Sequence, residues 1–220
     1  MSDTRNRLRR NDLRFVAFAR SLSAAQWQHA SLCTGWTNHD VLAHVVYGYQ
    51  APPVAMAAEI GRHRGSFDRA NCALARQFAT RHTPDELIDD LTAVMNMPRG
   101  VGRVFPPRLL LGDHVIHELD IALAIGRESE VDTEVLIAVL ETQVRVPNPF
   151  IPARSRARGL SLHACDAGWR HGTGPRVTGS AAHLASVLAG RPAALAHLEG
   201  DGVATLGARL PASERVVGES

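Results

Sequence analysis

Apolar residues recur at intervals of three and four from about Asp3 to Glu141, and this periodicity constrains the fold more than any other feature. Such spacing collects apolar side chains on one face of an α-helix. We therefore predict a four-helix bundle of long helices joined by modest loops, followed by one shorter helix. The long helices are expected near 4–26, 38–62, 67–97 with a break at Pro84, and 107–126, and the shorter one at 133–142.

Several helix starts carry capping residues. Thr37 precedes the apolar positions of the second long helix, and Thr83 stands before Pro84 in the segment "TPDEL". A threonine hydroxyl accepts a hydrogen bond from the first turn, and proline suits the first helical position. We expect both threonines to be N-caps, with Asp132 or Thr133 in the same role at the start of the shorter helix.

The pattern changes after "VPNPFIPARSRARG", in which prolines and a basic run indicate a solvated linker. Beyond it, "LSLHACD", "GWRHG" and "PRVTG" read as short strands joined by tight turns, and "SAAHLASVLAG" reads as a helix from Ser180 to Gly190. We predict an α+β, mainly α fold. It comprises a helical bundle at 1–147, a linker at 148–158 and a small α+β domain at 159–220.

Composition limits the classes of partner. The 220 residues, 45% of them hydrophobic, suffice for one buried core and a small second domain. The formal net charge of +2 argues against a nucleic-acid partner. The sequence has no apolar run long enough to span a membrane, so we expect no membrane partner. Cys33, Cys72 and Cys165 are widely spaced and odd in number, which favours reduced thiols. We expect a soluble cytoplasmic protein, monomeric or homodimeric.

Candidate chemistry is concentrated in the segment Arg108–Glu128. Asp113 and His117 are four residues apart, so they share one helix face, and Asp120 follows on the same stripe. Apolar residues flank this stripe on both sides, which makes the bundle interior a plausible destination for it. Burying these groups without a compensating charge would cost several kcal/mol. A divalent cation bound to Asp113, His117 and His44 of a facing helix would satisfy them and keep one position open.

Each of these residues also has a simpler interpretation. Asp113 and His117 are consistent with an ordinary i,i+4 surface pair, and His44 with a hydrogen-bonded core histidine. His114 lies off the line of Asp113 and His117 on a helical wheel, so we predict a surface or supporting position for it. Cys33 has no basic neighbour in the sequence, which favours a packed thiol over a reactive one.

The sequence resembles the mycothiol-dependent maleylpyruvate isomerase family at four places in order. These are "LCTGWTNHDVLAHV", "FDRANCALARQF", "LLLGDHVIHELDIALAIGR" and the tail "ACDAGWRHGTGPRVTGSAAHLASVLAGRPAALAHLEGDGVATLGARL". The resemblance implies a DinB-like four-helix bundle and a divalent metal, zinc or alternatively nickel, on His44, Asp113 and His117. It implies mycothiol as the thiol cosubstrate. The isomerase has Glu where this chain has Asp113, which leaves the choice of metal open. Asp120 would then orient a ligand imidazole or hold the helix end.

These features together favour an enzyme in which a metal activates a small thiol for attack on a small electrophile. Either isomerisation or S-transfer follows from that step, and neither catalytic nor cosubstrate-binding residues are identified by the sequence. A hydrolase that uses metal-bound water is one alternative. A non-catalytic ligand-binding bundle is another. The sequence contains no GxSxG elbow, P-loop or Rossmann glycine fingerprint that would indicate a different chemistry.

Overall fold

A computed structural model describes residues 3–97, 99–148 and 151–211 of the chain. They are mostly helical, with one small sheet, which confirms the predicted α+β, mainly α class. The chain divides into two compact units, Met1–Val131 and Asp132–Ser220. None of the helices in the described residues is long and apolar enough to cross a membrane.

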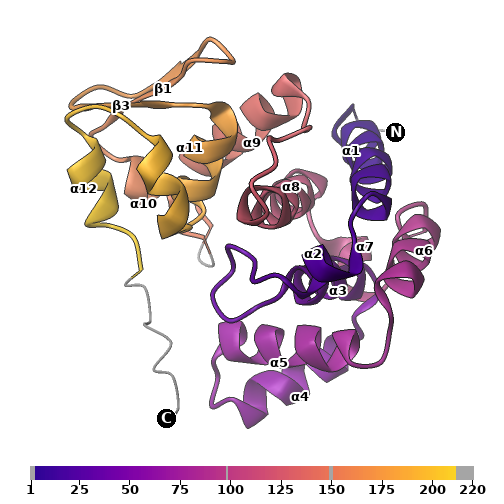
Figure 1. The fold of residues 1–220 in the computed structure, drawn as a ribbon. Helices are drawn as coiled ribbons and strands as arrows, with labels where there is room; N and C mark the ends of the chain where they lie inside the picture. Colours follow the sequence, from indigo (N-terminus) through magenta and orange to yellow (C-terminus); the bar gives the residue numbers. More distant parts are fainter. Residues whose placement is uncertain (1–2, 98, 149–150, 212–220) are drawn as a thin grey trace, which may run out of the picture. The chain divides into compact units, whose positions relative to one another are not determined.

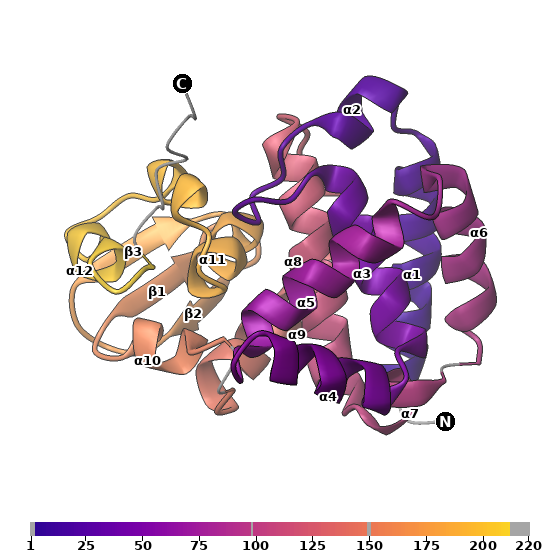
Figure 2. The same ribbon diagram turned by 90° about the horizontal axis from the view of Figure 1, so that it is seen from below.

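The first unit is a helical bundle built around four helices. α1, α3, α6 and α8 form a closed ring in which each helix packs on two of the others (Figures 1 and 2). α5 packs against α3 outside this ring, and α4 packs against α5. The bounds of the elements are α1 Asp3–Arg20, α2 Ala24–Gln28, α3 Asn38–Gln50, α4 Pro53–Arg62, α5 Phe67–Ala79, α6 Pro84–Val94, α7 Gly100–Val104 and α8 Pro107–Ala124. Each of the four ring helices contributes a fully buried side chain to the core, for example Phe15, Leu42, Leu87 and Leu119.

Two of the predicted long helices are interrupted. The segment predicted as 38–62 is split between Gln50 and Pro53, because proline lacks a donor N–H and disfavours helical backbone in the residue before it. Within the segment predicted as one helix at 4–26, α1 ends at Arg20 and Ser23 caps a separate helix, α2. The predicted break at Pro84 is confirmed, since α5 ends at Ala79.

The predicted threonine caps are present. Thr37 Oγ1 accepts a hydrogen bond from the Asp40 backbone N–H at 3.1 Å, and the Asp40 carboxylate accepts one from the Thr37 N–H at 2.9 Å. Thr83 and Glu86 form the same reciprocal arrangement at the start of α6. Such capping boxes satisfy two helix-terminal N–H groups at once. Asp132 occupies the N-cap position of α9 without a capping hydrogen bond from its side chain.

The second unit contains a three-stranded sheet and short helices. Its elements are α9 Thr133–Arg145, α10 Ala153–Ala157, β1 Ser161–Ala164, β2 Trp169–His171, β3 Arg176–Gly179, α11 Ala181–Leu188, the 3₁₀ helix η1 Pro192–His197 and α12 Val203–Gly207. The strand order is β2-β1-β3, with β1 antiparallel to β2 and parallel to β3. Leu162 of β1 is fully buried and pairs with Val177 of β3. The strands predicted from the sequence are therefore present.

The second compact unit begins at Asp132, so α9 belongs to it. α9 packs on α10 and α11 of the second unit, and Trp169 Nε1 donates a hydrogen bond to Glu141 Oε1 at 2.7 Å. The basic run placed in the predicted linker forms α10, in which Arg154 is exposed, and ends at exposed Arg158. Arg156 is buried there, and its Nη1 donates to the carbonyl of Leu188 at 2.8 Å, which satisfies an acceptor at the end of α11.

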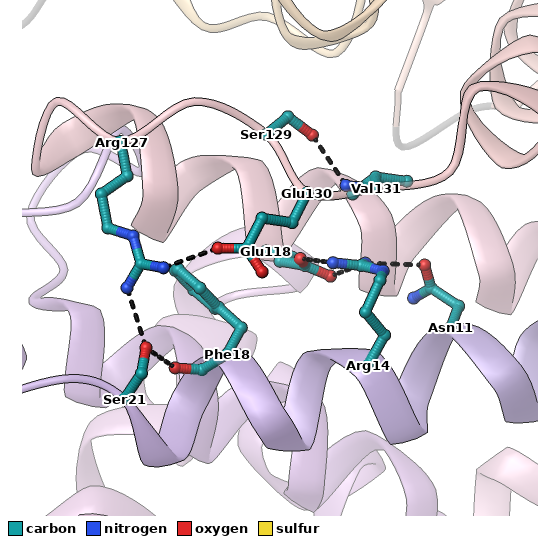
Figure 3. A network of polar contacts seen from close by, with 9 residues as sticks. All are labelled: Asn11, Arg14, Phe18, Ser21, Glu118, Arg127, Ser129, Glu130 and Val131. Carbon is teal, nitrogen blue, oxygen red and sulfur yellow. Dashed lines mark hydrogen bonds and ion pairs between the residues drawn. The ribbon is translucent and has the colours of Figure 1, made fainter.

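Charged side chains tie α1 to α8. The Arg14 guanidinium forms a two-pronged ion pair with Glu118, and it also donates to Asn11 Oδ1 at 3.0 Å (Figure 3). Burial raises the pKa of Glu118 above its ordinary value, although Arg14 acts in the opposite direction. At the end of α8, Arg127 donates to Ser21 Oγ at 2.8 Å and lies 4.8 Å above the Phe18 ring. These contacts fix the rotation of α8 about its axis.

Replacing Thr37 with Ala should lower the free energy of unfolding by about 1 kcal/mol, because it leaves the Asp40 N–H at the start of α3 without its capping partner. Urea denaturation followed by circular dichroism measures this change. Thr37→Ser keeps the hydroxyl and is the matched control, expected to stay close to the wild-type midpoint. Equal midpoints for the Ala and Ser variants would show that this cap does not stabilise the unit.

Candidate metal centre

The structure brings His44, Asp113 and His117 together. α3 supplies the first residue, and α8 supplies the other two from one face, as their spacing of four predicts. Asp113 Oδ2 lies 3.7 Å from His44 Nε2, and Asp113 Oδ1 lies 3.6 Å from His117 Nε2. One donor atom from each residue falls within 4.8 Å of the other two. The carboxylate thus stands between the two imidazoles.

Asp120 controls the orientation of the His117 ring. It is fully buried one turn along α8, and its Oδ2 lies 3.1 Å from His117 Nδ1. A carboxylate can only accept here, so the proton is assigned to Nδ1 when His117 is neutral. Nε2 then carries the lone pair and faces Asp113. A carboxylate that holds the second nitrogen of a histidine in this way is typical of metal-binding imidazoles.

Electrostatics in the cluster favour a bound positive charge. Burial acts to raise the pKa of Asp113, but His117 and His44 outweigh it and hold that pKa below its ordinary value. Burial acts to lower the pKa of His117, yet Asp113 and Asp120 raise it to about 10. For His44, burial prevails and lowers the pKa. Without a cation, these neighbours favour the protonated form of the His117 ring, so a metal would compete with a proton for it.

Trp36 covers one side of the cluster. Its ring centroid lies 5.2 Å from that of His44 and 6.0 Å from that of His117, while its Nε1 donates to Cys72 Sγ at 2.9 Å. The Asp113 side chain retains 34% exposure, so the carboxylate remains accessible from solvent. The sequence interpretation did not identify Trp36 as part of the site. The available signal was a tryptophan directly before the Thr37 cap, eight residues before His44.

Cys33 contacts Asp120, the carboxylate that orients His117. Its Sγ–H donates to Asp120 Oδ2 at 3.5 Å, so that one carboxylate oxygen serves both the thiol and the imidazole. The Leu32 backbone N–H donates to the Asp120 carbonyl at 3.1 Å, which fastens this loop to α8. The sequence favoured a packed cysteine, and the contact with Asp120 has no local sequence signal.

His114 differs from its predicted surface or supporting position. It is fully buried, and its Nδ1 lies 2.8 Å from Asp12 Oδ1, while the Tyr49 hydroxyl donates to the other oxygen of Asp12. Burial acts to lower the pKa of His114, but Asp12 raises it above the ordinary value. α8 is buried on more than one face, so its polar residues need partners on α1 as well as on α3.

The donor set fits a divalent metal. Two imidazole nitrogens and one carboxylate are ligand types that zinc accepts, and a catalytic zinc usually has three protein ligands and one open position. The Nδ1–Asp120 contact already selects the tautomer that such binding needs. His44, Asp113 and His117 are thus able to hold the ion, with Asp120 supporting His117.

The comparisons with known proteins identify the first unit. Residues 8–96 match the family described as the Mycothiol maleylpyruvate isomerase N-terminal domain. Over these residues the chain is similar to that domain. The match confirms the resemblance seen in the sequence and includes His44, while Asp113 and His117 lie beyond its end. No curated protein matches the chain.

Two solved structures share the fold over most of the chain. One is the crystal structure of a mutant of the mycothiol-dependent maleylpyruvate isomerase, with 16% identity, a TM-score of 0.56 and coverage of 90% of this chain and 92% of that chain. The other is described as the crystal structure of the mycothiol-dependent maleylpyruvate isomerase, with 18% identity, a TM-score of 0.53 and coverage of 86% and 88%. At this identity the likeness concerns the fold. It extends beyond the family match into the second unit.

Replacing Asp120 with Asn should weaken metal binding by roughly 10- to 100-fold, because the amide no longer stabilises the Nδ1–H tautomer as a carboxylate does. Chelator competition measures the dissociation constant. Asp89→Asn is the control for loss of a carboxylate elsewhere in the same unit, since Asp89 is exposed on α6 and pairs with Arg20. An unchanged dissociation constant for Asp120→Asn would contradict the orienting role.

Proposed function

We propose that this protein is a metal-dependent enzyme that uses a low-molecular-weight thiol, mycothiol, as an isomerase or S-transferase acting on a small electrophile. The convergence of His44, Asp113 and His117 supports this proposal, because these donors come from two helices and leave one side of the cluster open. The family match of residues 8–96 and the fold shared with the mycothiol-dependent isomerase structures support the choice of thiol. We expect zinc as the metal, with nickel as the alternative.

In this proposal the metal, when bound, supplies a positive charge that stabilises the thiolate form of a thiol at neutral pH. The residues of the chain hold and shape the site. His44 and His117 would contribute neutral nitrogens and Asp113 one negative charge, so a divalent ion with these three ligands would carry a net charge of +1 toward an incoming anion. Asp120 keeps His117 in the required tautomer.

The thiolate then adds to an activated double bond or another electrophilic carbon. If the adduct rotates about the new single bond and loses the thiolate, the outcome is cis–trans isomerisation. If the enolate formed by this addition takes up a proton from solvent and the adduct is released, the outcome is S-transfer. Trp36 stands against both imidazoles and shields that side of the cluster from water. A drier site strengthens the attraction between the thiolate and its counter-charges.

His117→Ala should abolish stoichiometric metal in the purified protein, because it removes the one ligand that contacts both Asp113 and Asp120. Elemental analysis by mass spectrometry measures the metal content. Retention of one zinc or nickel per chain would exclude His117 as a ligand. Replacing half-buried His163 of the second unit with Ala is the control for histidine loss elsewhere, and this variant should retain the metal.

Turnover of a maleyl-type substrate should require added thiol. Product formation is measured with the metal-loaded protein in the presence and absence of mycothiol, with His117→Ala as the inactive control. Because the proposed nucleophile is the thiol, omission should reduce the rate to that of the control. Full turnover without thiol would favour the hydrolase alternative, in which metal-bound water attacks, and would leave the metal site standing.

A further inference from the structure

We propose that Cys33, Asp120 and His117 form a second cation site, selective for thiophilic metals, that cannot be filled at the same time as the first. Asp120 Oδ2 lies beside Nδ1 of the His117 ring, and Cys33 Sγ contacts the same oxygen, whereas Asp113 lies beside Nε2. The existence of this site is independent of the proposed function. The competition between the two sites rests on the proposed function, because it requires the first site to bind a metal.

Two of the three ligand separations are close to those of a tetrahedral site. Zinc bonds of about 2.3 Å to sulfur and about 2.0–2.2 Å to nitrogen and oxygen imply ligand separations of about 3.6 Å for S···O and about 3.4 Å for N···O. The observed separations are 3.5 Å from Cys33 Sγ to Asp120 Oδ2 and 3.1 Å from His117 Nδ1 to the same oxygen. All three donor atoms lie within 4.8 Å of one another. Small side-chain shifts would therefore suffice to admit an ion.

The ligand set favours soft metals. A thiolate and a carboxylate together carry two negative charges, whereas Asp113 alone carries one in the first site. Thiolate ligands select zinc, cadmium and other thiophilic ions over harder cations. Asp120 is fully buried and His117 is 7% exposed, while Cys33 is half-buried and provides access from outside.

The loop that carries Cys33 is already held in place. The Leu32 N–H donates to the Asp120 carbonyl at 3.1 Å, and the Cys33 N–H donates to Ser31 Oγ at 3.1 Å. The Ser31 N–H in turn donates to the Trp36 carbonyl at 2.9 Å. The thiol is therefore positioned by main-chain hydrogen bonds and needs little ordering on metal binding.

Exclusion between the two sites follows from the chemistry of imidazole. Neutral His117 has one lone pair, on Nε2 for the first site or on Nδ1 for the second. Filling the second site releases the Cys33 thiol proton to solvent and moves the His117 proton from Nδ1 to Nε2. The first site then lacks a ligand. A thiophilic metal in excess should accordingly displace the metal of the first site.

Cobalt(II) titration of the metal-free protein tests this inference. A cobalt–thiolate bond produces a charge-transfer band in the near ultraviolet, whereas nitrogen and oxygen ligands do not. His44→Ala weakens the first site and should bind one Co²⁺ with this band. Adding Cys33→Ser to His44→Ala should remove the band and weaken Co²⁺ binding roughly tenfold or more. Cys165→Ser in the same background is the matched control and should keep the band.

The outcomes separate the two proposals. Absence of the band in His44→Ala and also in Asp113→Asn, each with wild-type circular dichroism, would overturn the second site. Binding of two Co²⁺ per wild-type chain would overturn the exclusion. If the first site is wrong, the band should still appear in His44→Ala, but Cys33→Ser alone would bind no Co²⁺. If only the second site is wrong, Cys33→Ser alone would bind one Co²⁺ as the wild type does.

Discussion

The need to pair the charges buried on α8 governs the arrangement of the first unit. This helix buries His114, His117, Glu118 and Asp120, and an unpaired charge in such a place would cost several kcal/mol. α1 supplies Arg14 for Glu118, and the same helix supplies Asp12 for His114. With these two contacts on the α1 side, the remaining polar face of α8 is turned toward α3. The candidate metal centre therefore depends on pairs that contain none of its ligands.

Local features of the sequence predict most of the helical framework. Thr37 with Asp40 and Thr83 with Glu86 act within a few residues of one another, so their spacing is sufficient evidence for a helix start. The i,i+4 spacing of Asp113 and His117 likewise fixes their common face on α8 without knowledge of the fold. The end of α3 at Gln50 was also encoded locally, by the two prolines that follow, but the apolar periodicity that continues through 53–62 obscured it.

Contacts between distant segments could not be predicted in the same way. Asp12 and His114 are 102 residues apart, and the sequence around each gives no indication of the other. Cys33 and Asp120 are 87 residues apart and meet because one main-chain hydrogen bond holds their segments together. A helix buried on several faces is also difficult to recognise, because apolar residues then surround its polar ones instead of opposing them. For this reason His114 read as a surface or supporting residue.

His117 connects the two sides of the candidate centre. Asp113 faces one ring nitrogen at 3.6 Å and Asp120 faces the other at 3.1 Å, so two carboxylates compete to define where the ring proton lies. Asp120 is fully buried and makes the shorter contact with the ring. Asp113 is partly exposed and also contacts His44. The proton of the neutral ring is therefore held toward Asp120. This asymmetry makes His44 and Asp113 the preferred partners of a cation, and any change that weakens the Asp120 contact shifts the balance toward the Cys33 side.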